Sequence, residues 1–253
     1  MPLAFTVRSP MQIMLSEFQD QLVRGLSHRM NNILTLFHGY LGLLLENEKL
    51  DHVTQDGLGK IKDGARVATE LMDRTNALVR PTNLMPREIM LGEFLAQLAP
   101  TFEKLRGLGS KIEVETVGEV PLVWADPSRI RLALTELVKN ACEATASGGD
   151  IRIVIEAAEL KTFAPAGADQ PSQWVSISVV DGGKGFASGM EAQLYEPFST
   201  TKKKQTVAGL GLTVAMGCMQ QVGGAIDHDS SPGRTTFRLI LPAKQGGKIR
   251  AAA

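Results

Sequence analysis

The sequence predicts an α+β protein in which an N-terminal helical hairpin, completed as a four-helix bundle by a second copy, precedes an α/β sandwich. Two stretches before residue 81 carry apolar residues at helical spacing. After residue 86, strand-like and helix-like stretches alternate and are separated by glycines. Pro81 and Pro86 mark the boundary, so the expected units are residues 1–82, residues 86–243 and a disordered tail at 244–253.

The hairpin should occupy residues 11 to about 80, with a polar turn at 47–53. At about 100° per residue, the apolar side chains of its first helix form one stripe, made of Leu15, Phe18, Leu22, Leu26, Ile33, Phe37 and Leu44. The second helix has the alternating three- and four-residue steps of a coiled coil, at Leu58, Ile61, Ala65, Ala68, Met72, Thr75 and Val79. One hairpin cannot bury both stripes on itself, so we expect a homodimer. A hairpin folded back on the second unit is the alternative.

The second unit should contain helices at about 91–106, 127–146 and 210–222. The expected strands are 111–117, 151–157, 174–180, 225–229 and 235–241. Asp126 before Pro127 is typical of a helix start, because aspartate caps free N–H groups and proline suits the first turn. Residues 161–173 contain prolines and a glycine, and they predict a loop between two strands.

The composition excludes several classes of protein. Hydrophobic residues make up 43% of the chain and charged residues 21%, as in a globular protein. The 27 basic and 27 acidic residues cancel, so no overall charge attracts nucleic acid or an acidic membrane, and phosphate binding must be local. Cys142 and Cys218 form neither a disulfide framework nor a zinc motif, which fits a reducing compartment. With no signal peptide and no membrane-spanning run in the sequence, we expect a cytoplasmic protein without membrane insertion.

Three local motifs each have a structural and a chemical interpretation. Residues 181–185, an aspartate with three glycines, follow a strand and predict either a plain turn or backbone that approaches a ligand. Residues 209–211, Gly-Leu-Gly, precede a helix whose free N–H groups and dipole suit a phosphate. Glu136 and Asn140 share one helix face, which is either solvated or a source of oxygen ligands for Mg²⁺.

The order of these motifs resembles that of the N, G1, F and G2 boxes in the ATP-binding domain of sensor histidine kinases. The similarity covers about residues 86–242 and includes residues 124–127, at the start of the first ATP-binding helix. In order, the boxes correspond to Glu136–Asn140, Asp181–Gly185, Glu196–Lys202 and Gly209–Leu212, followed by a final strand at Gly233–Phe237.

The resemblance implies a site for ATP and Mg²⁺. Asn140 would bind the metal ion, and Glu136 would orient water or metal. Asp181 would accept a hydrogen bond from the adenine amino group, which selects adenine over guanine because a carboxylate cannot donate. Phe198 would anchor a mobile lid that starts near Ala187. The remaining implied nucleotide contacts are Lys139, Gly183, Gly185, Thr201, Lys202, Gly209, Leu210, Gly211, Leu212 and Thr236.

The hairpin carries the candidate nucleophile. His28 and His38 lie on the first helix, and a helical wheel places both away from the apolar stripe, so geometry does not choose between them. Residues 26–32 resemble the H box of the same kinases, which implies that His28 is the nucleophile. A neutral imidazole, with an unperturbed pKa of about 6.5, can attack the γ-phosphoryl group through Nε2 if it is held in line.

Two features depart from the family pattern, and a third matches only some members of the family. Arg29 stands where most of these kinases carry an acid, which weakens the expectation of fast autophosphorylation. Asn32 resembles the residue that orients water in family members that dephosphorylate their response regulator. The stretch 233–237 has one glycine fewer than the usual final strand.

The resemblance therefore predicts a homodimeric histidine kinase core that phosphorylates His28 with Mg·ATP, passes the group to the receiver domain of a response regulator, and also acts as its phosphatase. A separate sensory protein should supply the signal, since only about ten residues precede the first helix. The alternatives are a response-regulator phosphatase with weak kinase activity, and a non-catalytic phosphotransfer or docking dimer.

Overall fold

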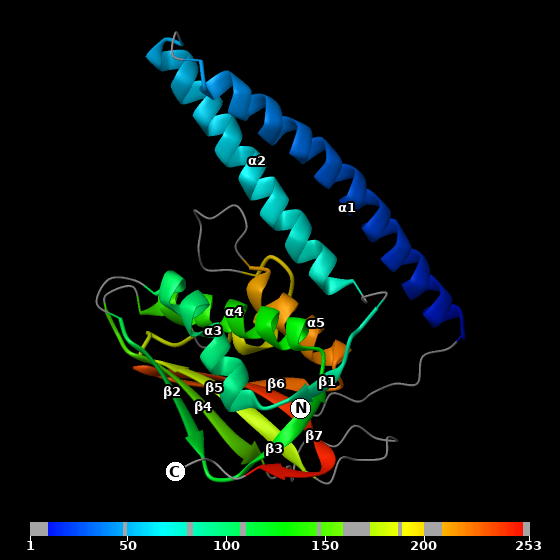
Figure 1. The fold of residues 1–253 in the computed structure, drawn as a ribbon, viewed down its shortest axis with the longest axis vertical. Coiled ribbons are helices and arrows are strands. Elements are labelled where there is room, and N and C mark those ends of the chain that lie inside the picture. Colours follow the sequence, from blue (N-terminus) through cyan, green and yellow to red (C-terminus); the bar gives the residue numbers. More distant parts are fainter. Residues whose placement is uncertain are drawn as a thin grey trace.

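The computed structural model describes residues 10–47, 50–79, 83–106, 110–145, 148–158, 173–186, 189–199 and 209–249. The predicted α+β class is confirmed, because a long helical hairpin leads into a unit built of one seven-stranded sheet with α-helices on one face (Figure 1). Within these described ranges, no helix has both the length and the hydropathy that a bilayer-spanning segment needs.

The hairpin consists of two antiparallel helices, α1 (Pro10–Leu45) and α2 (His52–Leu78) (Figure 1). α2 begins inside the predicted turn of 47–53, because the Asp51 carboxylate accepts a hydrogen bond from Thr54 N at 2.9 Å and caps the helix. The hairpin residues that are buried in a single chain are mostly small or aliphatic and include Ser27, Leu34, Leu41, Ala65 and Ala77.

The apolar stripe predicted on α1 remains exposed in the single chain. Leu22, Leu26, Ile33, Phe37 and Leu44 are between 48% and 58% exposed, because Leu34 and Leu41 pack on α2 instead. The side chains of Leu15 and Phe18 lie outside the described part. The hairpin thus leaves a continuous apolar face uncovered.

The sheet has the strand order β1-β3-β7-β5-β4-β2, and β6 also pairs with β7. The pair β2 and β4 is parallel, whereas the other pairs are antiparallel. Asp181, the last residue of β5, lies opposite Thr235. The strands are β1 (Arg87–Ile89), β2 (Ile112–Val117), β3 (Val120–Ala125), β4 (Ile151–Ala158), β5 (Trp174–Asp181), β6 (Ala225–Ser231) and β7 (Arg234–Ile249).

Three helices lie between the sheet and the hairpin: α3 (Leu91–Leu105), α4 (Pro127–Ala144) and α5 (Gly211–Gln221) (Figure 1). Asp126 caps α4 as predicted, since its carboxylate accepts from Ser128 N at 2.8 Å. The helices place apolar residues at helical spacing over the alternating apolar residues of the strands. The fully buried residues of this core include Leu95, Leu98, Ile130, Leu134, Leu137, Ile151, Ile153, Ile155 and Ile177.

Three strands differ from the prediction. The sequence pattern does not predict β1, which has three residues, or β3, which contains Pro121 and so lacks one strand N–H. The prediction of a disordered tail from residue 244 is wrong as far as Ile249, because β7 continues there and pairs with β3. Residues 250–253 and nearly all of the predicted loop at 161–173 lie outside the described residues.

The last turn of α2 packs against α5. Gln221 Nε2 donates hydrogen bonds to Ala77 O at 3.1 Å and to Val79 O at 3.3 Å. Gly217 lies close to the same turn, since a Cβ built on it would be 3.4 Å from Leu78 Cδ2. The second unit therefore rests on the end of the hairpin that is remote from the α1–α2 turn (Figure 1).

Candidate active site

The turn after β5 is shaped by Asp181 and Gly183. Asp181 Oδ1 accepts a hydrogen bond from Gly183 N at 2.8 Å. A Cβ on Gly183 would lie 2.6 Å from that oxygen and 2.7 Å from Ala144 Cβ, far inside normal van der Waals separation. The loop continues through Gly185 to Phe186, whose N–H donates to Ser230 Oγ at 3.2 Å. These contacts bring the predicted G1 residues together against the end of α4 and against β6.

Asp181 is a buried carboxylate at the end of a buried strand. Burial raises the pKa of Asp181, because the charged form loses its hydration, and the hydrogen bond from Gly183 opposes the shift. A ligand that donates a hydrogen bond to this carboxylate would offset the cost of its burial.

The predicted N and G2 boxes meet where α4 passes the start of α5. Glu136 is buried, and Asn140 lies one turn further along the same face. A Cβ on Gly211 would be 2.9 Å from Glu136 Oε2 and 3.6 Å from both polar atoms of the Asn140 amide. The absence of a side chain at residue 211 therefore lets the first turn of α5 approach both polar groups.

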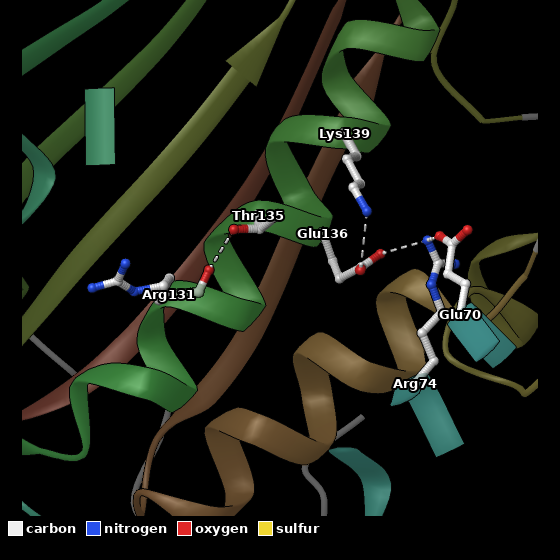
Figure 2. A network of polar contacts seen from close by, with 6 residues as sticks. All are labelled: Glu70, Arg74, Arg131, Thr135, Glu136 and Lys139. Carbon is white, nitrogen blue, oxygen red and sulfur yellow. Dashed lines mark hydrogen bonds and ion pairs between the residues drawn. The ribbon is translucent and has the colours of Figure 1, made fainter. Parts of the chain in front are cut away.

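Two cations lie beside the Glu136 carboxylate (Figure 2). Lys139 Nζ is 3.9 Å from Oε1, and Arg74 Nη2, from α2, is 3.6 Å from Oε2. The same guanidinium donates to Glu70 Oε1 at 2.9 Å. The sequence shows the i, i+4 spacing of Glu70 and Arg74, but it gives no sign that Arg74 reaches across to α4.

The predicted F box contacts the G2 box through the backbone. Phe198 N donates to Gly209 O at 2.8 Å, and both residues have positive φ, 64° and 87°. A Cβ on Gly209 would be 2.6 Å from the Phe198 carbonyl carbon. Phe198 is exposed and Leu210 is buried, while Leu212 packs partly buried against the core. The predicted contacts Thr201 and Lys202, together with Ala187, lie outside the described residues.

A cluster of aromatic side chains supports this segment, and sequence reasoning missed it. Tyr195 Oη and His228 Nδ1, on β6, are 3.0 Å apart. His228 also packs near Phe186 and Phe237, with ring centroids 6.0 and 6.2 Å away. Burial raises the pKa of Tyr195. Thr236 is buried on β7 beside Phe237 and pairs with Val180, the residue before Asp181, and its contact with a nucleotide stays a prediction.

The two histidines of α1 are not equivalent, so the prediction that both are exposed is wrong for His38. His28 is exposed, and its Nδ1 lies 3.4 Å from the amide nitrogen of Asn32. His38 is partly buried, with Nε2 3.3 Å from Thr69 Oγ1. Because Thr69 donates its hydroxyl hydrogen to Ala65 O, its oxygen accepts from His38 Nε2. Of these two rings, that of His28 is the exposed one.

The pairing of His38 with Thr69 also fixes the level of His28 along the hairpin. Because α1 and α2 are antiparallel, ten residues back from His38 correspond to about ten residues forward from Thr69, which places His28 near the level of Val79. Val79 accepts a hydrogen bond from α5. The exposed histidine thus lies at the end of the hairpin on which the second unit rests.

The chain is similar to known proteins in sequence and in fold. Residues 125–245 match the family described as histidine kinase-, DNA gyrase B- and HSP90-like ATPases. Over 229 residues the chain is 31% identical to the sensor kinase CckA of Brucella abortus (strain 2308), covering 88% of this chain and 24% of that protein. The chain is a histidine kinase catalytic core. Its second unit is therefore an ATP-binding domain of the histidine kinase type.

Two solved structures show that the fold of the kinase core extends over the hairpin. Full-length ShkA in complex with AMPPNP superposes with a TM-score of 0.64, at 23% identity, covering 92% of this chain and 47% of that chain. The histidine kinase ThkA in complex with the response regulator protein TrrA gives a TM-score of 0.56, at 20% identity, covering 88% of this chain and 61% of that chain. The kinase core thus spans only part of these relatives.

A substitution at Gly183 tests whether the turn after β5 requires a residue without a side chain. Gly183→Ala should lower the free energy of unfolding by about 1–3 kcal/mol and weaken nucleotide binding, because the new methyl group overlaps Asp181 and Ala144. Gly182→Ala is the matched control, since the nearest atom to its Cβ is 3.9 Å away. Equal effects of the two substitutions in urea unfolding and in nucleotide titration would contradict the close packing of Gly183 against Asp181 and Ala144.

The buried carboxylate of Asp181 predicts a pH dependence of stability. The pKa of Asp181 is raised above the ordinary value of 3.8, so the folded protein holds the carboxyl proton more tightly than the unfolded chain does. Stability is therefore lost as the pH rises from 3.8 through the raised pKa. Asp181→Asn removes the group, so the unfolding free energy of the variant relative to the wild type should rise as the pH increases above 3.8. The same variant should lose adenine nucleotide binding. A pH-independent difference in urea unfolding would contradict this account.

Proposed function

We propose that this kinase core transfers the γ-phosphoryl group of Mg·ATP to His28 and then to an aspartate of a response regulator. The observation that carries the proposal is the approach of Gly211 to Glu136 and Asn140, in a domain that rests on the hairpin end bearing the exposed His28. The same domain holds Asp181 buried at the turn where an adenine amino group would donate.

The residues beside Gly211 fit a magnesium ion. Asn140 offers an amide oxygen and Glu136 a carboxylate, and hard cations prefer such oxygen ligands. Gly211 leaves room next to both groups, in the space a Cβ would fill. When bound, the ion would neutralise the charge of the ATP phosphates. Among the residues that the structure describes, no side chain caps α5, so its first N–H groups and its dipole would bind phosphate oxygens.

At His28 the ring needs a free lone pair on Nε2. Turned by 180°, the Asn32 amide would accept a hydrogen bond from Nδ1–H with its oxygen, which holds the tautomer that leaves Nε2 unprotonated. Nε2 attacks the γ-phosphorus, forming a P–N bond. The bond from phosphorus to the bridging oxygen breaks, and ADP leaves with that electron pair. The Nδ1 proton of the phosphorylated ring passes to solvent.

In the second step, a carboxylate oxygen of the receiver aspartate attacks the phosphorus of phospho-His28. A P–O bond forms, the P–N bond breaks and the ring nitrogen keeps the electron pair. The complex of ThkA with a response regulator protein supports a partner of this kind.

The exposed apolar face of α1 supports the proposal of a homodimer. The stripe from Leu22 to Leu44 faces away from α2, so a second hairpin can cover it by forming a four-helix bundle. Burial of these side chains against a partner hairpin would stabilise the dimer by roughly 25 cal/mol for each Å² of apolar surface removed from water.

The position of Asn32 favours a second candidate function. Its amide lies 3.4 Å from His28 on the exposed side of α1, where it could orient a water toward an aspartyl phosphate. With Arg29 in place of the usual acid, the core would then act mainly as a response-regulator phosphatase. In that case regulator dephosphorylation depends on Asn32 and survives Asn140→Ala.

The histidine assignment is tested by labelling with γ-labelled ATP and Mg²⁺. The wild type should take up acid-labile, base-stable label, and His28→Gln should lose more than about 95% of it, because the nucleophile is absent. His38→Gln is the matched control and should retain most of the label, since Nε2 of His38 is engaged with Thr69. Label that persists in His28→Gln would overturn the assignment.

The dimer is tested by a charge in the middle of the apolar stripe. Phe37→Glu should weaken dimerisation at least about tenfold in sedimentation equilibrium, because a buried carboxylate would lack a partner. Thr35→Glu, also exposed on α1 but outside the stripe, should leave the dissociation constant nearly unchanged. A monomeric wild type, or equal effects of both substitutions, would contradict the dimer.

A further inference from the structure

We propose that Arg74 is a positioning residue that docks the ATP-binding domain on the hairpin through Glu136 and thereby opposes engagement of Glu136 with Mg·ATP. This inference rests on the proposed function, because it concerns the regulation of the same site. It is carried by one juxtaposition, in which a cation from α2 lies beside the buried carboxylate of the N box (Figure 2).

The Glu136 carboxylate is buried but loosely held. Only 5% of its side chain is exposed, so its charge needs a nearby cation. The distances to Arg74 and Lys139, 3.6 and 3.9 Å, exceed the roughly 2.7–2.9 Å of a charge-assisted hydrogen bond. A cation that came closer could therefore displace the arginine.

Arg74 is shared between the two domains. Its side chain is 15% exposed, and its Nη2 lies 2.9 Å from Glu70 Oε1 on its own helix. The same Nη2 atom faces Glu136 on α4. Two carboxylates from different domains thus compete for one guanidinium. Weakening the contact to Glu70 should strengthen the contact to Glu136, and removing Arg74 should free Glu136.

The ion pair lies next to the docking contact of the whole domain. Three residues after Arg74, Ala77 O accepts a hydrogen bond from Gln221 of α5, and Leu78 packs on Gly217. Since linkage is reciprocal, a docking contact that opposes Mg·ATP must itself be weakened by Mg·ATP to the same degree. Nucleotide binding would then loosen the ATP-binding domain near the level of His28 on the hairpin.

The test compares three glutamine variants in calorimetric titration with AMPPNP, with and without Mg²⁺. Arg74→Gln should bind Mg·AMPPNP about three- to tenfold more tightly than the wild type. Glu70→Gln should bind it more weakly by a similar factor, because Arg74 then turns fully to Glu136. Arg66→Gln is the matched control, since Arg66 pairs with Asp63 at 4.0 Å on the exposed side of the same helix and should have no effect.

Hydrogen exchange gives a readout that does not depend on activity. In the wild type, Mg·AMPPNP should speed amide exchange in residues 74–79 and 217–221 by the same factor by which Arg74→Gln tightens the binding of Mg·AMPPNP. In Arg74→Gln, this effect of the nucleotide on exchange should largely disappear. Arg74→Lys, which keeps the charge without the planar fork, should restore part of the coupling. This separates the ion pair from a general loss of folding.

The outcomes are distinguishable. If Arg74→Gln binds Mg·AMPPNP like the wild type or more weakly, or if Glu70→Gln binds it more tightly, the inference is wrong while the proposed function stands. If the wild type shows no magnesium-dependent binding, both the proposed function and this inference fail. Opposite shifts in Arg74→Gln and Glu70→Gln, with no shift in Arg66→Gln, would support the coupling.

Discussion

The close approach of α4 and α5 at Gly211 is the constraint on which the rest of the site depends. The buried residues of α4 fix that helix on the sheet, so Glu136 and Asn140 project from a rigid surface. Any side chain at residue 211 would push α5 away from them. That movement would also carry the backbone of Gly209 away from Phe198 and shift Gln221 from the end of α2. The lack of a side chain at Gly211 therefore allows three contacts at once, those of α5 with α4, of Gly209 with Phe198 and of Gln221 with the end of α2.

The same region places two carboxylates where water is scarce. Asp181 and Glu136 are both 4% exposed, and a buried carboxylate costs free energy unless a donor or cation compensates it. Asp181 has one backbone donor, and Glu136 has two cations at longer range. Within the described residues, both carboxylates therefore retain part of the free-energy cost of their burial.

Much of this arrangement could be predicted from the sequence, because the signals are local. The cap at Asp126, the glycines after β5 and the Gly-Leu-Gly before α5 each specify backbone within a few residues, and the structure places them as expected. The i, i+4 spacing of Glu136 and Asn140 put both on one helix face, although the spacing alone did not show that Glu136 is buried.

Contacts between distant segments could not be predicted in this way. Nothing near Arg74 in the sequence indicates that it meets Glu136, and nothing near Tyr195 indicates His228. The exposure of His38 was misjudged because a helical wheel shows the face of one helix without the position of its neighbour, and Thr69 lies on that neighbour. The strand beyond residue 243 was missed for the same reason, because main-chain pairing with β3 needs no apolar pattern.

The long strand β7 has a practical consequence for handling this protein. Its first half flanks the Asp181 turn, while its far end pairs with β3, which leads directly into the Asp126 cap of α4. Shortening the chain at Ala243 would strip the outer strands of their neighbour and loosen the base of α4 from a distance. Affinity tags and fluorescent fusions at the carboxyl terminus should accordingly follow a spacer placed after Ile249.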